Sequence, residues 1–211
     1  MNQLAAVTVR ELSVPTWPTH FSFATTVPLQ RSPAAHTEAG RLVALHALGL
    51  AGCHAVELPP RSGRRPAWPT GFVGSIAHDD ALAVAVAARA GAARTLGIDV
   101  ERHDALDAGD AVIVLRDEER ELVRDDASVA TLLWSAKESA YKAWCTALDA
   151  DLDGVDPRDI HVTVLDSGAL RVDAVGELHD RVAAIGALDG GSLRLGDLLL
   201  TLAWKLQPAP A

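Results

Sequence analysis

The feature that most constrains the fold of this chain is a pattern that occurs once in each half of its 211 residues. In the first half, apolar side chains recur at helical spacing over residues 34–50, and short apolar runs bounded by turn residues follow. The second half has an apolar stripe over residues 128–148 and further short runs. Each half therefore offers one long helix and about three strands. We expect an α+β fold of two similar lobes, over residues 1–103 and 104–211.

The strands, loops and shorter helices are expected from apolar runs and the turn residues between them. The expected strands are residues 21–26, 71–76, 81–88, 95–100, 160–165, 170–175 and 193–205. Residues 59–71 hold four prolines, three arginines and two glycines, a composition typical of a loop. Residues 101–110 are expected to be a polar connection, and the charged run at 117–124 a short helix.

The composition excludes several classes of protein. Apolar residues make up 49% of the chain, which is enough to form a core and excludes general disorder. The net charge of −9 argues against nucleic-acid binding, because that binding depends on neutralising phosphates with Lys and Arg. No basic and apolar leader is visible at the N-terminus, and no apolar run reaches the roughly 20 residues of a membrane span.

The two cysteines, Cys53 and Cys145, are too few and too far apart for a disulfide framework or a zinc site. They are expected to be free thiols in a reducing compartment. We therefore expect a soluble, cytoplasmic protein that has neither nucleic acid nor membrane as a partner.

A pair of carboxylates ends the strand expected at residues 95–100. Asp99 and Glu101 are two residues apart, so they project from one face of the strand, while Ile98 and Val100 project from the other. Two neighbouring carboxylates repel each other unless a cation or a proton lies between them, and a hard divalent ion suits oxygen ligands. The alternative is a solvated strand end with two acidic side chains.

A second group of charges lies on the helix expected at residues 128–148. Trp134, Glu138 and Lys142 follow one another at four-residue spacing and share one face, while Lys137 and Tyr141 occupy the neighbouring stripe. The tryptophan beside these charges indicates a partly desolvated site. The alternative is an ordinary exposed Glu–Lys pair, which stabilises a helix by a few tenths of a kcal/mol.

Basic side chains in the first half complete the candidate site. His78 ends an apolar strand and can donate to phosphate oxygens, although a histidine there is also common as a plain surface residue. Arg41 lies on the first helix, and Arg61, Arg64 and Arg65 lie in the Pro/Gly loop. Guanidinium groups suit phosphates, and the alternative is a solvated basic loop. Together with the carboxylates, these groups are the parts of a Mg²⁺-assisted transfer from a phosphate-rich donor.

Five short motifs, in order, resemble those of the 4′-phosphopantetheinyl transferases of the larger, pseudodimeric type, and within them the branch that activates enterobactin-like peptide synthetases. The motifs are Gly40-Arg41, Arg64-Arg65-Pro66-Ala67-Trp68-Pro69-Thr70-Gly71, Gly74-Ser75-Ile76-Ala77-His78, Gly97-Ile98-Asp99-Val100-Glu101, and Trp134 through Lys142. The motifs run from Gly40 to Lys142, and the resemblance as a whole covers about residues 32–145. Two positions depart from the family pattern, because Ala77 replaces the frequent Ser or Thr and Trp134 replaces the usual Phe. Residues 31–39 lack the family pattern.

The resemblance implies an enzyme that moves the 4′-phosphopantetheine group of coenzyme A onto a serine of an apo carrier protein and releases 3′,5′-ADP, with Mg²⁺ as cofactor. It implies a coenzyme A-binding N-terminal lobe and a C-terminal lobe that carries the Lys-Glu helix and docks the carrier. The implied roles are Asp99, Glu101 and Glu138 for Mg²⁺; Arg41, Arg64, Ser75, His78, Lys137 and Lys142 for coenzyme A; Asp99, Glu138 and Lys142 for catalysis; and Trp134 for the wall of the pantetheine channel.

The expected mechanism and partners follow from that resemblance. Glu138 is the preferred general base for the carrier serine, with a metal-bound water as the alternative. The carrier is expected to be a peptidyl, aryl or acyl carrier of secondary metabolism or siderophore synthesis. A monomer is expected, because two lobes in one chain can form the cleft.

Arg116, Arg120 and Arg124 form a stripe on the short helix that is expected to contact the carrier, unless acidic neighbours pair with it. Rival functions are a Mg-dependent phosphoester or nucleotide hydrolase and a non-catalytic module that binds coenzyme A or carrier domains.

Overall fold

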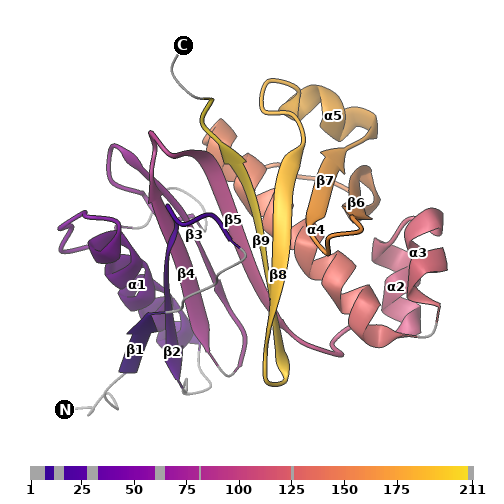
Figure 1. The fold of residues 1–211 in the computed structure, drawn as a ribbon, viewed down its shortest axis with the longest axis horizontal. Coiled ribbons are helices and arrows are strands. Elements are labelled where there is room, and N and C mark those ends of the chain that lie inside the picture. Colours follow the sequence, from indigo (N-terminus) through magenta and orange to yellow (C-terminus); the bar gives the residue numbers. More distant parts are fainter. Residues whose placement is uncertain are drawn as a thin grey trace.

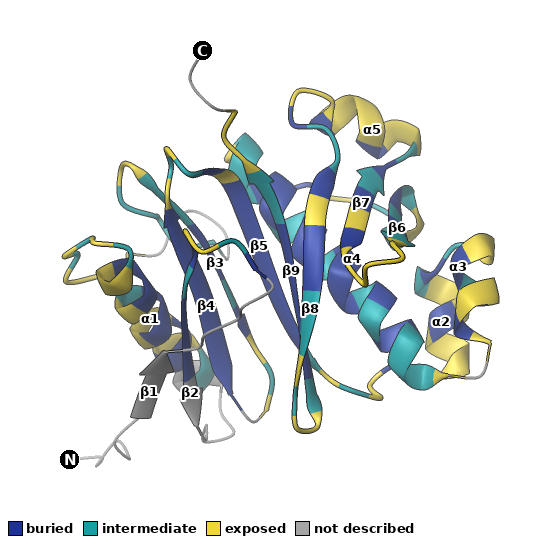
Figure 2. Ribbon diagram, in the orientation of Figure 1, coloured by how far each residue is buried: buried dark blue, intermediate teal, exposed yellow. Residues whose placement is uncertain are grey.

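A computed structural model describes residues 8–11, 17–27, 33–59, 65–80, 82–124 and 126–208. The chain folds into four layers, with one long helix on the outside of each of two sheets (Figure 1). This arrangement buries both faces of the central strands, and Figure 2 shows β4 (Ala83–Arg89) and β5 (Ala93–Arg102) buried along most of their length. The expected α+β fold of two lobes is confirmed.

The first sheet is antiparallel and has the strand order β1-β2-β4-β3. Its other strands are β1 (Thr8–Glu11), β2 (Ser22–Val27) and β3 (Phe72–His78), and helix α1 (Pro33–Leu50) covers one face. Alternate residues of β4 serve the two faces, because successive side chains of a strand point to opposite sides. Ala83, Ala85 and Ala87 pack under α1, whereas Val84 and Val86 face the second sheet.

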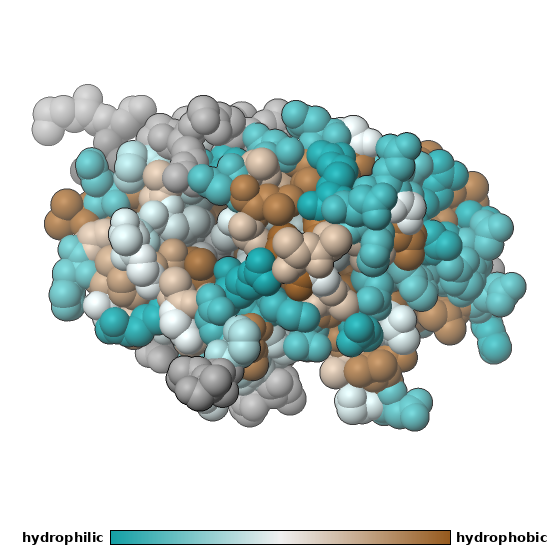
Figure 3. Space-filling model, turned by 90° about the horizontal axis from the view of Figure 1, so that it is seen from above, coloured by the Kyte–Doolittle hydropathy of each residue, from teal (hydrophilic) through white to brown (hydrophobic). Residues whose placement is uncertain are grey.

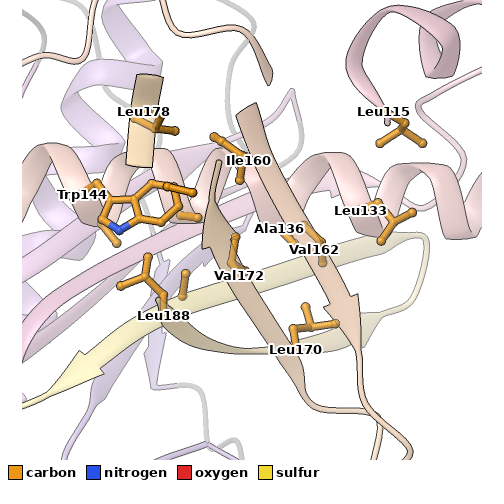
Figure 4. Close-up of a cluster of buried hydrophobic side chains, with 14 of the residues drawn as sticks. Leu115, Leu133, Ala136, Trp144, Ile160, Val162, Leu170, Val172, Leu178 and Leu188 are labelled. Atoms are coloured by element: carbon orange, nitrogen blue, oxygen red, sulfur yellow. The ribbon is translucent and has the colours of Figure 1, made fainter. Parts of the chain in front are cut away.

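The second sheet has the order β5-β9-β8-β7-β6 and is also antiparallel. Its other strands are β6 (Ile160–Val164), β7 (Leu170–Ala174), β8 (Leu188–Leu195) and β9 (Leu198–Leu206). Helix α4 (Ala127–Leu148) covers its outer face. In Figure 4, Leu133, Ala136 and Trp144 of α4 point toward apolar side chains of β6, β7 and the start of β8. These contacts hold α4 firmly in place.

Short helices flank this lobe: α2 (Ala108–Val114), α3 (Asp117–Val123), the 3₁₀ turn η1 (Pro157–Asp159) and α5 (Gly176–Val182). Seen from above, hydrophilic residues predominate over this half of the molecule (Figure 3). Among the described residues, no helix is both long enough and apolar enough to cross a membrane.

Strand β5 joins the two lobes. It is hydrogen bonded to β9 in the second sheet, yet Leu96, Ile98 and Val100 pack against the inner face of the first sheet. The division of the chain at residue 103 stays a prediction, but by hydrogen bonding β5 belongs with the strands that follow it.

The expected strands and long helices agree with the structure, except near the C-terminus and after β5. The single strand predicted at 193–205 is wrong, because Gly196 adopts a positive φ of 60° and turns the chain between β8 and β9. Strand β1, helices α2 and α5, the turn η1 and most of β8 were not predicted. Two adjacent glycines, Gly190 and Gly191, weaken the strand pattern of β8.

Candidate active site

The strand-end carboxylates lie where the alternation of β5 predicts. Leu96, Ile98 and Val100 point into the core between the sheets, so Asp99 and Glu101 point to the opposite face, toward α4. Asp99 is 5% exposed and Glu101 is partly buried. Burial of a charged group is costly unless it has partners, so the contacts of these two side chains decide what the site can do.

Gly97 allows α4 to approach β5 closely. A Cβ atom at this position would overlap the carbonyl oxygen of Ser139 and lie 2.6 Å from the backbone nitrogen of Ala143. Both of those atoms belong to α4, so the absence of a side chain sets the spacing between strand and helix. That spacing brings Asp99 within reach of side chains on α4.

Asp99 is held by two side chains of α4. Lys142 Nζ donates to Asp99 Oδ1 at 2.6 Å and to the carbonyl of Ile98 at 3.2 Å. Ser135 Oγ donates to Asp99 Oδ2 at 2.8 Å. Both carboxylate oxygens are thus engaged, and the ammonium group of Lys142 lies at the mouth of the site with 29% of its side chain exposed.

Glu101 and Glu138 both resist ionisation. Burial, and then the charge of Asp99, raises the pKa of Glu101 to about 7, although the Trp134 indole N–H donates a hydrogen bond that opposes the shift. Burial raises the pKa of Glu138, with Lys142 opposing the shift and Asp99 adding to it. The three carboxylates therefore lie close enough to interact electrostatically.

The described residues include no group of three or more His, Cys, Asp or Glu side chains already arranged around a metal position. The carboxylates nevertheless supply the hard oxygen donors that Mg²⁺ prefers, and their mutual repulsion favours a cation among them. In donor chemistry, Asp99, Glu101 and Glu138 fit Mg²⁺.

A cavity of about 680 Å³ opens beside Glu138 and draws its walls from both lobes, whereas Asp99 and Glu101 are not among the residues that line it. Arg41 of α1 and Ser75 and His78 of β3 line it from the first lobe, and Glu138 and Lys142 of α4 line it from the second. The structure therefore brings together most of the residues expected to bind coenzyme A. Arg64, and with it Arg61, lies outside the described residues.

A smaller cavity of about 250 Å³ adjoins the first, because Glu138 and Tyr141 line both. Its wall combines apolar side chains, among them Trp134, Leu152 and Val155, with the charged residues Lys137, Glu138 and Asp153. Glu138 therefore stands between the larger and the smaller cavity.

His36 also belongs to the site, although the sequence did not predict this. Its ring lies 5.0 Å from that of His78, measured between centroids, and it lines the larger cavity. Burial, and then the charges of His36 and Lys142, lowers the pKa of His78. Nε2 of His36 is buried without a hydrogen-bond partner among the described residues. No motif drew attention to His36, since residues 31–39 show no family pattern.

Arg65 ties the Pro/Gly loop to the second lobe along the rim of the larger cavity. Its guanidinium group donates to Asp151 Oδ1 at 2.8 Å and to the carbonyl of Cys145 at 3.0 Å, and lies 3.6 Å from Asp149. The loop is thereby fastened to the chain that follows α4.

The structure corrects the expected coenzyme A contact of Lys137. This side chain is 1% exposed and pairs at 2.6 Å with Glu119, which is equally buried. Lys137 Nζ also donates to the carbonyls of Val114 and Pro157, at 3.1 Å each. Its three hydrogen bonds are all used, so none remains for a phosphate. Lys137 turns away from Glu138 because its place on the helix faces α3.

The arginine stripe on the short helix is largely paired with acids. Arg116 contacts Glu118, and Arg120 contacts Asp117. Glu119 turns inward, where it accepts hydrogen bonds from the backbone N–H groups of Arg116 and Val162. These pairs favour the alternative of a solvated, mutually neutralised face.

The raised pKa of Glu101 predicts a pH dependence of stability. The folded protein holds this proton up to about pH 7, because the pKa of Glu101 is raised there, whereas the unfolded chain releases it near the ordinary glutamate pKa of 4.5. Folding therefore takes up a proton between these values, and the free energy of unfolding falls as pH rises through that window. Urea unfolding of the metal-free protein at about pH 5 and about pH 8 should show a smaller difference for Glu101→Gln than for the unaltered protein. Equal differences would contradict the prediction.

Two family models match this sequence. The model of the 4′-phosphopantetheinyl transferase N-terminal domain matches residues 37–88, and that of the 4′-phosphopantetheinyl transferase superfamily matches residues 95–202, which is more than half of the chain.

Individual relatives match over shorter stretches. The 4′-phosphopantetheinyl transferase Svp of Streptomyces mobaraensis is 40% identical over 129 residues, which cover 56% of this chain and 52% of the relative. Enterobactin synthase component D of Salmonella typhi is 37% identical over 116 residues, 50% of this chain and 46% of the relative. The chain spans about half the length of these relatives. Among solved structures, the acyl carrier protein synthase of Mycobacterium tuberculosis aligns with a TM-score of 0.44 and 24% identity, covering 55% of this chain and 97% of that one.

The two family models follow one another along the sequence and together span His78, Asp99, Glu101, Glu138 and Lys142. This chain belongs to the 4′-phosphopantetheinyl transferase superfamily.

Proposed function

We propose that this protein transfers the 4′-phosphopantetheine group of coenzyme A to a serine hydroxyl of an apo carrier protein and releases 3′,5′-ADP. The observation that carries the proposal is the position of Glu138, which lies between the two cavities and one helical turn from Lys142. The family match supports the same reaction.

The larger cavity suits the charged end of coenzyme A. Arg41, Ser75, His78 and Lys142 line it, and each can donate hydrogen bonds to phosphate oxygens. Lys142 donates to Asp99 and to the carbonyl of Ile98 in this structure, and its one remaining donor can bind a phosphate. The smaller cavity, with the apolar side chains of Trp134, Leu152 and Val155 on its wall, suits the pantetheine arm.

Asp99, Glu101 and Glu138 are the residues that would hold Mg²⁺. When bound, the ion supplies positive charge that offsets the pyrophosphate and the charge of the leaving 3′,5′-ADP. The chain contributes the donor oxygens and their placement, which Gly97 and the contacts of Asp99 define.

In the reaction, the serine Oγ forms a bond to the β-phosphorus of coenzyme A, and the bond from that phosphorus to the 3′,5′-ADP oxygen breaks. The serine proton passes to Glu138, directly or through a water, because this carboxylate stands where the two cavities meet. Arg41 and Lys142 hold phosphate charge in place, and positioning supplies much of the acceleration.

We further propose that the protein acts as a cytoplasmic monomer. Its carrier is proposed to be a peptidyl, aryl or acyl carrier of secondary metabolism or siderophore synthesis, which the similarity to enterobactin synthase component D supports. The first lobe is proposed to bind coenzyme A and the second to dock the carrier.

Incubation with coenzyme A, Mg²⁺ and an apo peptidyl carrier should raise the mass of the carrier by one phosphopantetheine group, as intact-protein mass spectrometry would show. A carrier whose acceptor serine is changed to alanine is the control and should stay unmodified. Release of 3′,5′-ADP without a carrier would instead indicate a hydrolase. Tight binding of coenzyme A without modification of the carrier, whichever divalent metal ion is added, would indicate a non-catalytic binding module.

A further inference from the structure

Three hydroxyl groups form a buried chain behind Asp99. Ser135 and Ser139 lie one turn apart on α4, and Thr201 lies opposite them on β9; all three are 0% exposed. Thr201 Oγ1 is 2.8 Å from Ser135 Oγ and 2.7 Å from Ser139 Oγ, and Ser135 Oγ is 2.8 Å from Asp99 Oδ2. The chain therefore runs from Ser139 through Thr201 and Ser135 to the carboxylate.

The direction of every proton in this chain follows from the charge at its end. Asp99 is paired with Lys142, and an ionised carboxylate only accepts hydrogen bonds, so Ser135 must donate its single proton to it. Thr201 must then donate to Ser135, and Ser139 to Thr201. Ser139 Oγ also lies 3.0 Å from the carbonyl of Thr201, which can share its proton. Hydrogen bonds aligned in this way polarise one another toward the carboxylate.

These serines depart from the usual behaviour of hydroxyl residues within a helix. Such side chains commonly bond to the carbonyl four residues earlier. Thr131 and Thr146 of the same helix do so, with Thr131 Oγ1 2.9 Å from the carbonyl of Ala127 and Thr146 Oγ1 2.9 Å from that of Lys142. Ser135 and Ser139 instead reach across to β9 and Asp99. Packing alone does not require a hydroxyl at position 201, because valine has almost the same shape as threonine.

We infer that Ser135, Thr201 and Ser139 are positioning residues that fix the orientation of the Asp99 carboxylate for the cation and phosphates of the proposed reaction. Ser135 restrains Oδ2, so that Oδ1 is the oxygen that accepts from Lys142, and Lys142 lines the larger cavity. Outer hydrogen bonds of this kind orient ligand carboxylates and tune metal affinity. The inference rests on the proposed function.

Thr201→Val removes the central hydroxyl, and Thr201→Ser keeps it as a matched control. Thr131→Val is a second control, because it removes a buried hydroxyl of α4 that has no contact with Asp99. The affinity for Mn²⁺ in the presence of coenzyme A is measured from the electron paramagnetic resonance signal of the free ion. This readout does not depend on turnover. The Mg²⁺ concentration for half-maximal transfer gives a second.

Thr201→Val is expected to weaken Mn²⁺ binding and to raise the half-maximal Mg²⁺ concentration by about 10- to 100-fold. Thr201→Ser should stay close to the unaltered protein, and Thr131→Val should lower the melting temperature without changing metal affinity. If Thr201→Val does not fold, Ser139→Ala is measured instead, because it removes the hydroxyl at the far end of the same chain.

Unchanged Mn²⁺ affinity in Thr201→Val, with the unaltered protein active, would overturn the inference and leave the proposed function standing. An unaltered protein that neither binds Mn²⁺ nor modifies the carrier would overturn the proposed function, and the inference with it.

Discussion

Glu138→Gln is expected to lower the rate of carrier modification by about 10²- to 10⁴-fold, the usual contribution of a general base. Glutamine keeps the shape of the side chain but cannot take the serine proton. Coenzyme A affinity should change little, because Arg41, Ser75, His78 and Lys142 remain to bind the phosphates. Single-turnover transfer to an apo carrier and calorimetric titration with coenzyme A measure the two effects separately.

Glu177→Gln is a suitable control, because Glu177 is exposed on α5 and lines neither cavity. It should leave both measurements unchanged. Near-normal turnover in Glu138→Gln at saturating Mg²⁺ would show that another group, such as a metal-bound water, accepts the proton.

The second large effect is expected from Lys137→Met. Removing the ammonium group leaves the Glu119 carboxylate buried, with two backbone N–H partners and no cation in direct contact among the described residues. Breaking a buried ion pair in this way costs about 3–5 kcal/mol. Urea unfolding should show this loss in the free energy of unfolding, and Lys205→Met, which removes one partly buried lysine contact, should cost about 1 kcal/mol.

The double variant Lys137→Met, Glu119→Gln should be more stable than Lys137→Met alone, because no unpaired charge is then buried. If Lys137 contacted coenzyme A instead, its replacement would lower ligand affinity and leave stability almost unaltered. Such a result would overturn the structural role assigned to it.

Local sequence periodicity predicted the parts of the site that lie on one element. The two-residue spacing of Asp99 and Glu101 placed both on the face of β5 opposite Ile98 and Val100. Helical spacing likewise grouped Glu138 with Lys142. These predictions succeeded because the geometry of a strand or helix fixes relative directions without reference to the rest of the fold.

Periodicity could not show which partner each side chain finds. Lys137 adjoins Glu138 in sequence, but consecutive positions of a helix face different directions. Only the packing of α3 against α4 shows that Lys137 faces Glu119. Thr201 carries no motif, and its role depends on the pairing of β9 with β5 across about half the chain. Contacts between such distant segments leave little trace in local patterns.

Because β5 contacts both lobes, it also limits how the molecule can move. On one face of this strand, Leu96, Ile98 and Val100 pack against the first sheet, and one edge of the strand is hydrogen bonded to β9. Swinging the lobes apart would expose these apolar side chains to water, which opposes a hinge motion between the lobes. We therefore expect substrates to enter a site whose two walls move little, and the movements that accompany catalysis to be those of side chains and of the loops at its rim.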